Sequence, residues 1–281
     1  MISKLFAQEF RMTRKSLFTS IGVLVLFALL ALAAAALRIP VLGELGLGGG
    51  VISIVIVLPL TFGVLAENYW RTMYGKEGYF TMTLPVRGRD LFTAKVLYGL
   101  AASVAAAVVG ALLALALSIT LALMNGQPAF STVQTFFKEL AANLELVGPA
   151  MVIFVVASIV LFLTYTIVAG AALMSIGAEG RFNHLGFGAP VLGGVITYVA
   201  MQVLGFAAML FIPLGVRIIG PDAGSFVAEG MFSGFVASVT DPSGQTQPEV
   251  IGVGIVFVSL IVTVLFAWRG ARSVERHTSL R

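Results

Sequence analysis

Residues 95–124 read KVLYGLAASVAAAVVGALLALALSITLALM, a stretch with no charged residue after Lys95. The hydrocarbon core of a bilayer is about 30 Å thick, and a helix that crosses it needs about 20 predominantly apolar residues. Five other stretches of the chain meet the same criterion. The six predicted spans are residues 18–37, 48–66, 95–124, 147–174, 187–214 and 249–268. We therefore expect an all-α membrane protein with six transmembrane helices, in which residues 1–281 form a single transmembrane domain.

The composition of the whole chain supports a membrane protein. Hydrophobic residues make up 59% of the 281 residues and charged residues 11%, whereas soluble domains have about 45–50% and about 25%. These values exclude a soluble fold and an intrinsically disordered chain. The chain has no cysteine, which excludes a disulfide framework, a thiolate metal site and a cysteine nucleophile.

The positions of Lys and Arg predict the orientation of the spans. The N-terminal segment carries four of them, the 67–95 loop five, the 177–184 loop one and the C-terminal tail four. Only Arg38, Lys138 and Arg217 fall on the other side. Because basic residues concentrate on the cytoplasmic side of membrane proteins, both termini and both loops are predicted to be cytoplasmic.

Residues 1–17 are predicted to form an amphipathic helix on the membrane surface. Their basic residues fall within one arc of about 100° of a helix, opposite an apolar face into which Glu9 projects. This membrane-surface set is Lys4, Arg11, Arg14 and Lys15. A simple basic flank of the first span explains the same charges equally well. A cleaved signal peptide is disfavoured, because the apolar run 21–37 exceeds the usual 7–15 residues.

The 67–95 loop, ENYWRTMYGKEGYFTMTLPVRGRDLFTAK, is much longer than a plain connection between helices, which needs about 2–8 residues. Gly75 and Gly78 predict a turn into a short element, and Pro85 interrupts the chain before the third span. An aromatic and charged cytoplasmic loop of this length favours a docking surface. The alternative is that its aromatic residues anchor the helices at the membrane interface.

Local structure can be predicted for two segments on the other side of the membrane. Residues 223–239 are apolar but interrupted by Glu229, and they are too short to span the membrane. We expect a re-entrant or interfacial hairpin there. Residues 125–146 are expected to form a short amphipathic helix.

The chain lacks the common catalytic patterns. Neither a GxxxxGK[ST] phosphate-binding loop nor an HExxH motif occurs, and His184 and His277 lie in polar segments. We expect no catalytic, cofactor-binding or metal-binding residue, and hence a transport subunit rather than an enzyme. Spans without charged interiors disfavour an ion-driven carrier and favour a pathway for an apolar or amphipathic substrate. Tyr165 and Tyr198 could line such a pathway, although packing is their more ordinary role.

Small residues recur every four positions in the third span and predict a close contact with another helix, within the chain or across a dimer. This helix-packing set is Ala102, Ala106, Gly110, Ala114 and Ser118.

Residues 74–96, YGKEGYFTMTLPVRGRDLFTAKV, resemble the loop after the second membrane helix in bacterial ABC transporter permeases of the type-2 exporter class. The family pattern is Gly-Lys-Glu-Gly-Tyr, then Leu-Pro-Val, then basic residues, a Leu and a final Lys. Its counterparts here are Gly75, Lys76, Glu77, Gly78, Tyr79, Leu84, Pro85, Val86, Arg87, Arg89, Leu91 and Lys95. Gly88 departs from the pattern, which has a polar or basic residue there.

The resemblance implies that a separate cytoplasmic ATPase docks on a coupling helix within about 76–85. The implied coupling residues are Lys76, Glu77, Gly78, Tyr79, Phe80, Leu84 and Pro85, with Tyr79 and Phe80 as anchors. The 177–184 loop, through Glu179 and Arg181, would make a secondary contact. Residues 223–239 would close the outer end of the pathway.

The resemblance also implies the composition of the assembly and its location. Two permeases, identical or paralogous, would work with two ATPases in the bacterial cytoplasmic membrane, in contact with its lipid and without nucleic acid. This chain would bind no cofactor, because ATP and magnesium belong to the ATPase.

Three alternatives are a secondary carrier without an ATPase, an ATPase-bound immunity or sensor component, and a membrane enzyme acting on lipid or peptide. The last is disfavoured by the missing catalytic groups. Substrate and direction of transport stay open at this point.

Overall fold

The computed structural model describes residues 2–75, 77–83, 85–219, 222–241 and 247–276. Among these residues, six helices are long and apolar enough to cross a membrane. They are α1 (Ile2–Ala36), α2 (Leu42–Met73), α4 (Gly88–Met124), α6 (Pro149–Gly177), α7 (Gly188–Phe211) and α9 (Gly254–Arg276). This confirms the prediction of a multi-pass, all-α membrane protein with six spans. The described part of the chain divides into two compact units, one within residues 2–143 and one within residues 144–276.

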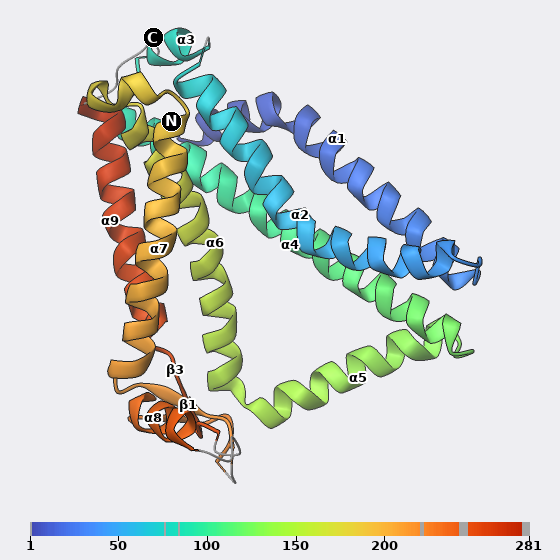
Figure 1. The fold of residues 1–281 in the computed structure, drawn as a ribbon. Helices are drawn as coiled ribbons and strands as arrows, with labels where there is room; N and C mark the ends of the chain where they lie inside the picture. Colours follow the sequence, from blue (N-terminus) through green and yellow to red (C-terminus); the bar gives the residue numbers. More distant parts are fainter. Residues whose placement is uncertain (1, 76, 84, 220–221, 242–246, 277–281) are drawn as a thin grey trace. The chain divides into compact units, whose positions relative to one another are not determined.

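In the first unit, α1, α2 and α4 pack against one another (Figure 1). The α1–α2 contact is close because glycines of α2 face α1. A Cβ atom on Gly46 would lie 2.1 Å from the carbonyl oxygen of Ala31, and one on Gly50 would lie 2.5 Å from Leu32. Small residues allow such close backbone approach between membrane helices.

The predicted packing stripe on α4 is only partly used within this unit. Ala106 and Gly110 are buried, and a Cβ atom on Gly110 would lie 3.2 Å from Val57 of α2. Ala102 and Ser118 are half-buried and Ala114 is exposed. Within the first unit, the closest helix contact is therefore made by glycines of α2 rather than by the stripe on α4.

The structure does not show a separate amphipathic surface helix over residues 1–17. Residues 2–36 form one continuous helix, and Leu5, Glu9, Thr13 and Leu17 are buried at successive intervals of four. One face of the first turns is therefore covered by the packed unit. The basic residues of the predicted surface set are all exposed on the remaining faces: Lys4, Arg11, Arg14 and Lys15.

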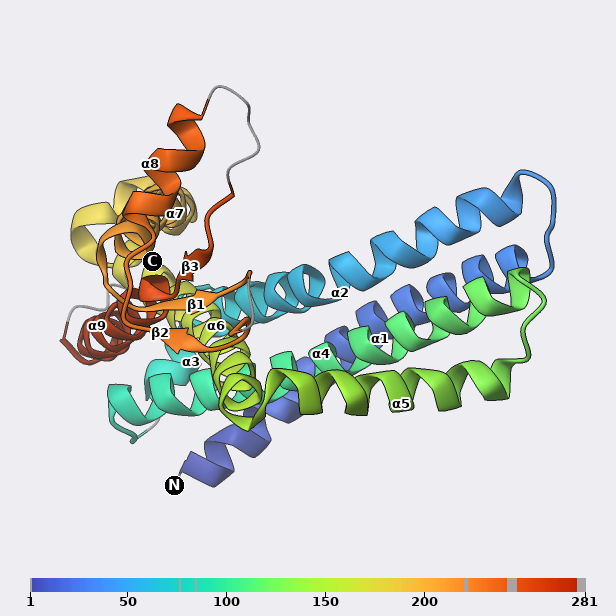
Figure 2. The same ribbon diagram turned by 90° about the horizontal axis from the view of Figure 1, so that it is seen from below.

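The second unit contains α6, α7 and α9, with a small antiparallel sheet at one end (Figure 2). Its strands are β1 (Gly215–Arg217), β2 (Phe226–Val227) and β3 (Val250–Gly252), in the order β2-β1-β3. Gly215 pairs with both Val227 and Gly252. A 3₁₀ helix, η1 (Gly180–Leu185), connects α6 to α7 at the other end.

The hairpin expected over residues 223–239 is replaced by strand β2 and helix α8 (Phe232–Thr240). Strand β2 pairs with β1, which precedes this segment, rather than with a partner inside it. The 125–146 prediction agrees better with the structure, because helix α5 (Ala129–Val147) occupies that segment.

Substitution of Gly46 tests the α1–α2 contact. Gly46→Ala should destabilise the protein by about 1–3 kcal/mol, because the added methyl group collides with backbone. Gly48→Ala is the matched control, since a Cβ atom on Gly48 has no neighbour within 4 Å. Unfolding equilibria in mixed detergent micelles measure both. Equal stability of the two variants would contradict the contact.

Candidate functional site

A short helix, α3 (Gly78–Thr83), follows α2 and lies within the predicted coupling segment 76–85. The turn between the helices requires glycine at position 75, because a Cβ atom there would lie 2.8 Å from the carbonyl oxygen of Arg71. The Gly75 amide donates to the carbonyl of Trp70 at 2.9 Å, and the Gly78 amide donates to that of Gly75 at 2.9 Å. These bonds set the direction in which α3 leaves α2.

Helix α3 exposes two neighbouring aromatic residues. Tyr79 is 54% exposed and Phe80 is 68% exposed. Beside them, Arg71 of α2 forms an ion pair with Glu77 at 3.3 Å, and both side chains are about half exposed. Of the other predicted coupling residues, Gly78 is buried and Pro85 is exposed. Lys76 and Leu84 lie outside the described residues.

The base of this loop is an aromatic cluster at the end of α2. The ring of Tyr74 lies 5.5 Å from that of Trp70 and 6.3 Å from that of Tyr69. Tyr69, Met73 and Tyr74 are buried. The loop aromatics thus divide into a buried group that supports α3 and an exposed pair on α3 itself. Tyr69 belongs to the interior of the unit, so it does not serve as an interfacial anchor.

Directly behind this cluster lies a buried ion pair between α1 and α4. The ammonium group of Lys95 donates to Glu9 Oε1 at 2.6 Å and to Thr72 Oγ1 at 2.8 Å. The amide of Asn68 donates to the other carboxylate oxygen of Glu9 at 3.3 Å. The Lys95 and Glu9 side chains are 3% and 8% exposed. The Lys95 ammonium also lies 5.6 Å from the ring centroid of Tyr69.

This network has one effect on the fold of the first unit. Two charges removed from water are tolerated only when they are paired and their remaining hydrogen bonds are made. Here the partners come from all three helices, since Glu9 belongs to α1, Thr72 and Asn68 to α2, and Lys95 to α4. A relative displacement of any of the three helices would leave a buried charge without its partner. The network therefore fixes the end of α2 from which α3 projects.

Sequence reasoning placed Glu9 on a surface helix and Lys95 at the edge of a loop, and both placements are corrected by their burial. In the sequence, the burial of Glu9 was indicated by its position in an otherwise apolar face of the predicted helix. A carboxylate there needs a buried cation, but a helical wheel does not show which cation it meets.

The second unit has its own buried carboxylate, Glu179, at the end of α6. Glu179 accepts hydrogen bonds from Arg269 and, at 2.9 Å, from Ser273, and it forms an ion pair with Arg181 at 3.1 Å. It is 4% exposed, whereas the side chain of Arg181 is 62% exposed. Glu179 is therefore an internal link between α6 and α9 rather than a surface contact, and Arg181 alone of the predicted secondary pair presents a side chain outward.

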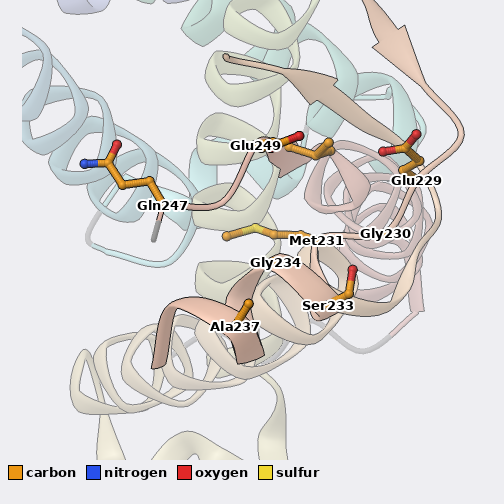
Figure 3. Close-up of a pocket in the computed structure, with 9 residues that line it drawn as sticks. Glu229, Gly230, Met231, Ser233, Gly234, Ala237, Gln247 and Glu249 are labelled. Carbon is orange, nitrogen blue, oxygen red and sulfur yellow. The ribbon is translucent and has the colours of Figure 1, made fainter. Parts of the chain in front are cut away.

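A pocket of about 240 Å³ lies beside the sheet of the second unit. Figure 3 shows Met231 between the carboxylates of Glu229 and Glu249 and the residues Ser233 and Ala237 of α8. Glu229 is paired with Arg217 at 3.0 Å. Within the described part of the chain, no group of three or more His, Asp or Glu residues is placed to hold a metal ion.

Comparison of the chain with models of protein families, with curated proteins and with solved structures found no match.

A double-mutant cycle on Glu9 and Lys95 tests the buried ion pair. Glu9→Gln or Lys95→Met alone should cost about 3–5 kcal/mol of unfolding free energy, because each leaves a buried charge unpaired. The double variant should recover much of that loss, since neither charge remains.

The exposed pair of Arg71 and Glu77 is the matched control for this cycle. Glu77→Gln should change the free energy of unfolding by no more than about 1 kcal/mol, because the pair is solvated. Unfolding in mixed micelles measures all four variants. Additive losses at Glu9 and Lys95 would show that the two side chains act independently.

Proposed function

We propose that this chain is the membrane-spanning permease subunit of an ATP-driven ABC exporter, driven by a separate cytoplasmic ATPase. The observation that carries the proposal is helix α3 with its exposed Tyr79 and Phe80, supported on a buried aromatic cluster and a buried ion pair. Large aromatic residues are the side chains that most often dominate the binding energy of protein interfaces.

The proposal assigns the energy source to the partner. The chain has no phosphate-binding loop, and in the proposal the partner ATPase supplies the work on the membrane helices. ATP and magnesium would be bound by that ATPase. The functional complex would contain two permeases and two ATPases, with both termini and α3 in the cytoplasm. This orientation is supported by the excess of Lys and Arg at these segments.

The geometry suggests how a push on α3 would be transmitted. The Arg71–Glu77 ion pair and the tight turn at Gly75 couple α3 to the last turn of α2. Glu9 and Lys95 then couple that turn to α1 and α4. A displacement at α3 would move three helices together instead of bending one of them.

Two further surfaces take secondary roles in the proposal. The exposed Arg181 of the second unit would make a secondary contact with the ATPase. The exposed basic residues of α1 would contact anionic headgroups of the inner leaflet.

The proposal predicts that Tyr79→Ala combined with Phe80→Ala releases the ATPase. Loss of two buried interface aromatics should weaken binding roughly thirtyfold or more. Affinity purification from native membranes in mild detergent, with mass spectrometry of the co-purifying chains, measures the retained ATPase. Thermal unfolding of the variant should stay near that of the parent, because both side chains are exposed in the chain itself.

Phe130→Ala, which removes an exposed aromatic residue of α5, is the matched control and should leave the ATPase bound. A chain that purifies without any ATPase would favour a self-sufficient carrier. ATPase binding that is unchanged by the double variant would remove Tyr79 and Phe80 from the coupling role. A bound ATPase without substrate flux would favour an immunity or sensor component.

A further inference from the structure

Helices α6, α7 and α9 of the second unit line an open groove of about 350 Å³ along their membrane-spanning lengths. Part of its wall is open because Gly194 of α7 carries no side chain, and a Cβ atom there would have no neighbour within 4 Å. Phe162, Leu173 and Ile255 supply apolar surface. Six polar side chains also line the groove: Tyr165, Thr166, Thr197, Tyr198, Gln202 and Ser259.

The groove lies well inside the spans. Tyr165 is 12 residues from the end of α6 at Gly177, and Gln202 is 14 residues from the start of α7 at Gly188. At 1.5 Å per residue, these separations correspond to about 18 and 21 Å along the helices. A hydrocarbon core of about 30 Å therefore surrounds both side chains.

Five of the six polar side chains of the groove have no hydrogen-bond partner in the described part of the chain. The exception is Thr166, which donates to the carbonyl of Phe162 at 2.9 Å. Polar groups at membrane depth are costly without partners and are found mainly where they serve a function. The amide of Gln202 is the strongest case, because it carries two donors and an acceptor.

We propose that this groove binds an uncharged amphipathic molecule that carries hydroxyl or amide groups. Its polar group would exchange hydrogen bonds with Tyr165, Tyr198 and Gln202, and its apolar part would lie along Phe162, Leu173 and Ile255. A charged headgroup is disfavoured, because no residue that lines the groove carries a charge to compensate it. Binding follows from the groove alone, and only the role of the bound molecule as exported cargo depends on the proposed function.

The test uses an octadecanamide with a photoreactive diazirine in its chain. The chain of 281 residues is purified with any co-purifying ATPase and placed in phosphatidylcholine nanodiscs. The nanodiscs are illuminated at increasing concentrations of the probe, and the labelled residues are mapped by mass spectrometry. Probes of the same chain length ending in a carboxylate or a quaternary ammonium group are the charge controls. We expect saturable labelling of α6 and α7 by the amide and much weaker labelling by the charged probes.

Variants of the groove sharpen the test. Tyr165→Phe with Gln202→Leu should weaken labelling by about tenfold or more, because it removes two of the side chains that exchange hydrogen bonds with the polar group of the probe. Gly194→Leu should block the groove sterically. If the variant with both Tyr165→Phe and Gln202→Leu fails to fold, Tyr165→Phe alone is used to test the hydrogen bonds. Thr164→Val is the matched control, because Thr164 lies on the same helix outside the groove and bonds to its own backbone.

Labelling that rises in proportion to the probe, as for bulk lipid, would overturn the proposal. The proposal would also be overturned by equal labelling with the three probes or by labelling that the groove variants leave unchanged. Crosslinks that show a second copy of the chain in the groove would overturn it as well. Saturable labelling of a chain that carries no ATPase would support the groove and count against the proposed function. An ATPase-bound chain without saturable labelling would support the proposed function and count against the groove as a binding site.

Discussion

The ion pair between Glu9 and Lys95 is the interaction on which the first unit depends. Apolar contacts alone give membrane helices little preference for one register, because lipid is as apolar as the helix surfaces. A buried charge is different, since it tolerates only positions in which its partner is present. With Thr72 and Asn68 completing the network, the pair specifies how α1, α2 and α4 are aligned at one end. Close contacts at Gly46 and Gly50 then bring α1 and α2 together further along.

The same principle operates separately in the second unit. Glu179 links the end of α6 to Arg269 and Ser273 of α9. In each unit a buried carboxylate joins a helix to another that is distant in the chain. It lies next to a loop for which the family resemblance implied a contact with the ATPase. The loops are thereby held on rigid supports. A rigid support is what a docking loop requires if force applied to it is to reach the membrane helices.

Much of the architecture was predictable from local sequence. Six long apolar stretches specify six helices because the length of such a stretch is a property of the stretch itself. A short element at α3 was also expected, from the two glycines and Pro85, and the family resemblance implied that it is a helix. The continuity of α1, the sheet of β1, β2 and β3, and the burial of Glu179 were not predicted. Each depends on contacts between residues far apart in the chain, and no sequence window contains both partners.

The sequence by itself determined that the chain is a membrane protein with six spans, because apolar length and the distribution of charge are local quantities. It also marked the aromatic loop that follows α2. Only the tertiary structure decided which of those aromatics are buried and which are exposed, and that Lys95 belongs to an internal ion pair rather than to a loop. It alone brought Tyr165, Tyr198 and Gln202 into one groove. The physical reason is that burial and pairing are relations between helices, and they exist only once the helices pack.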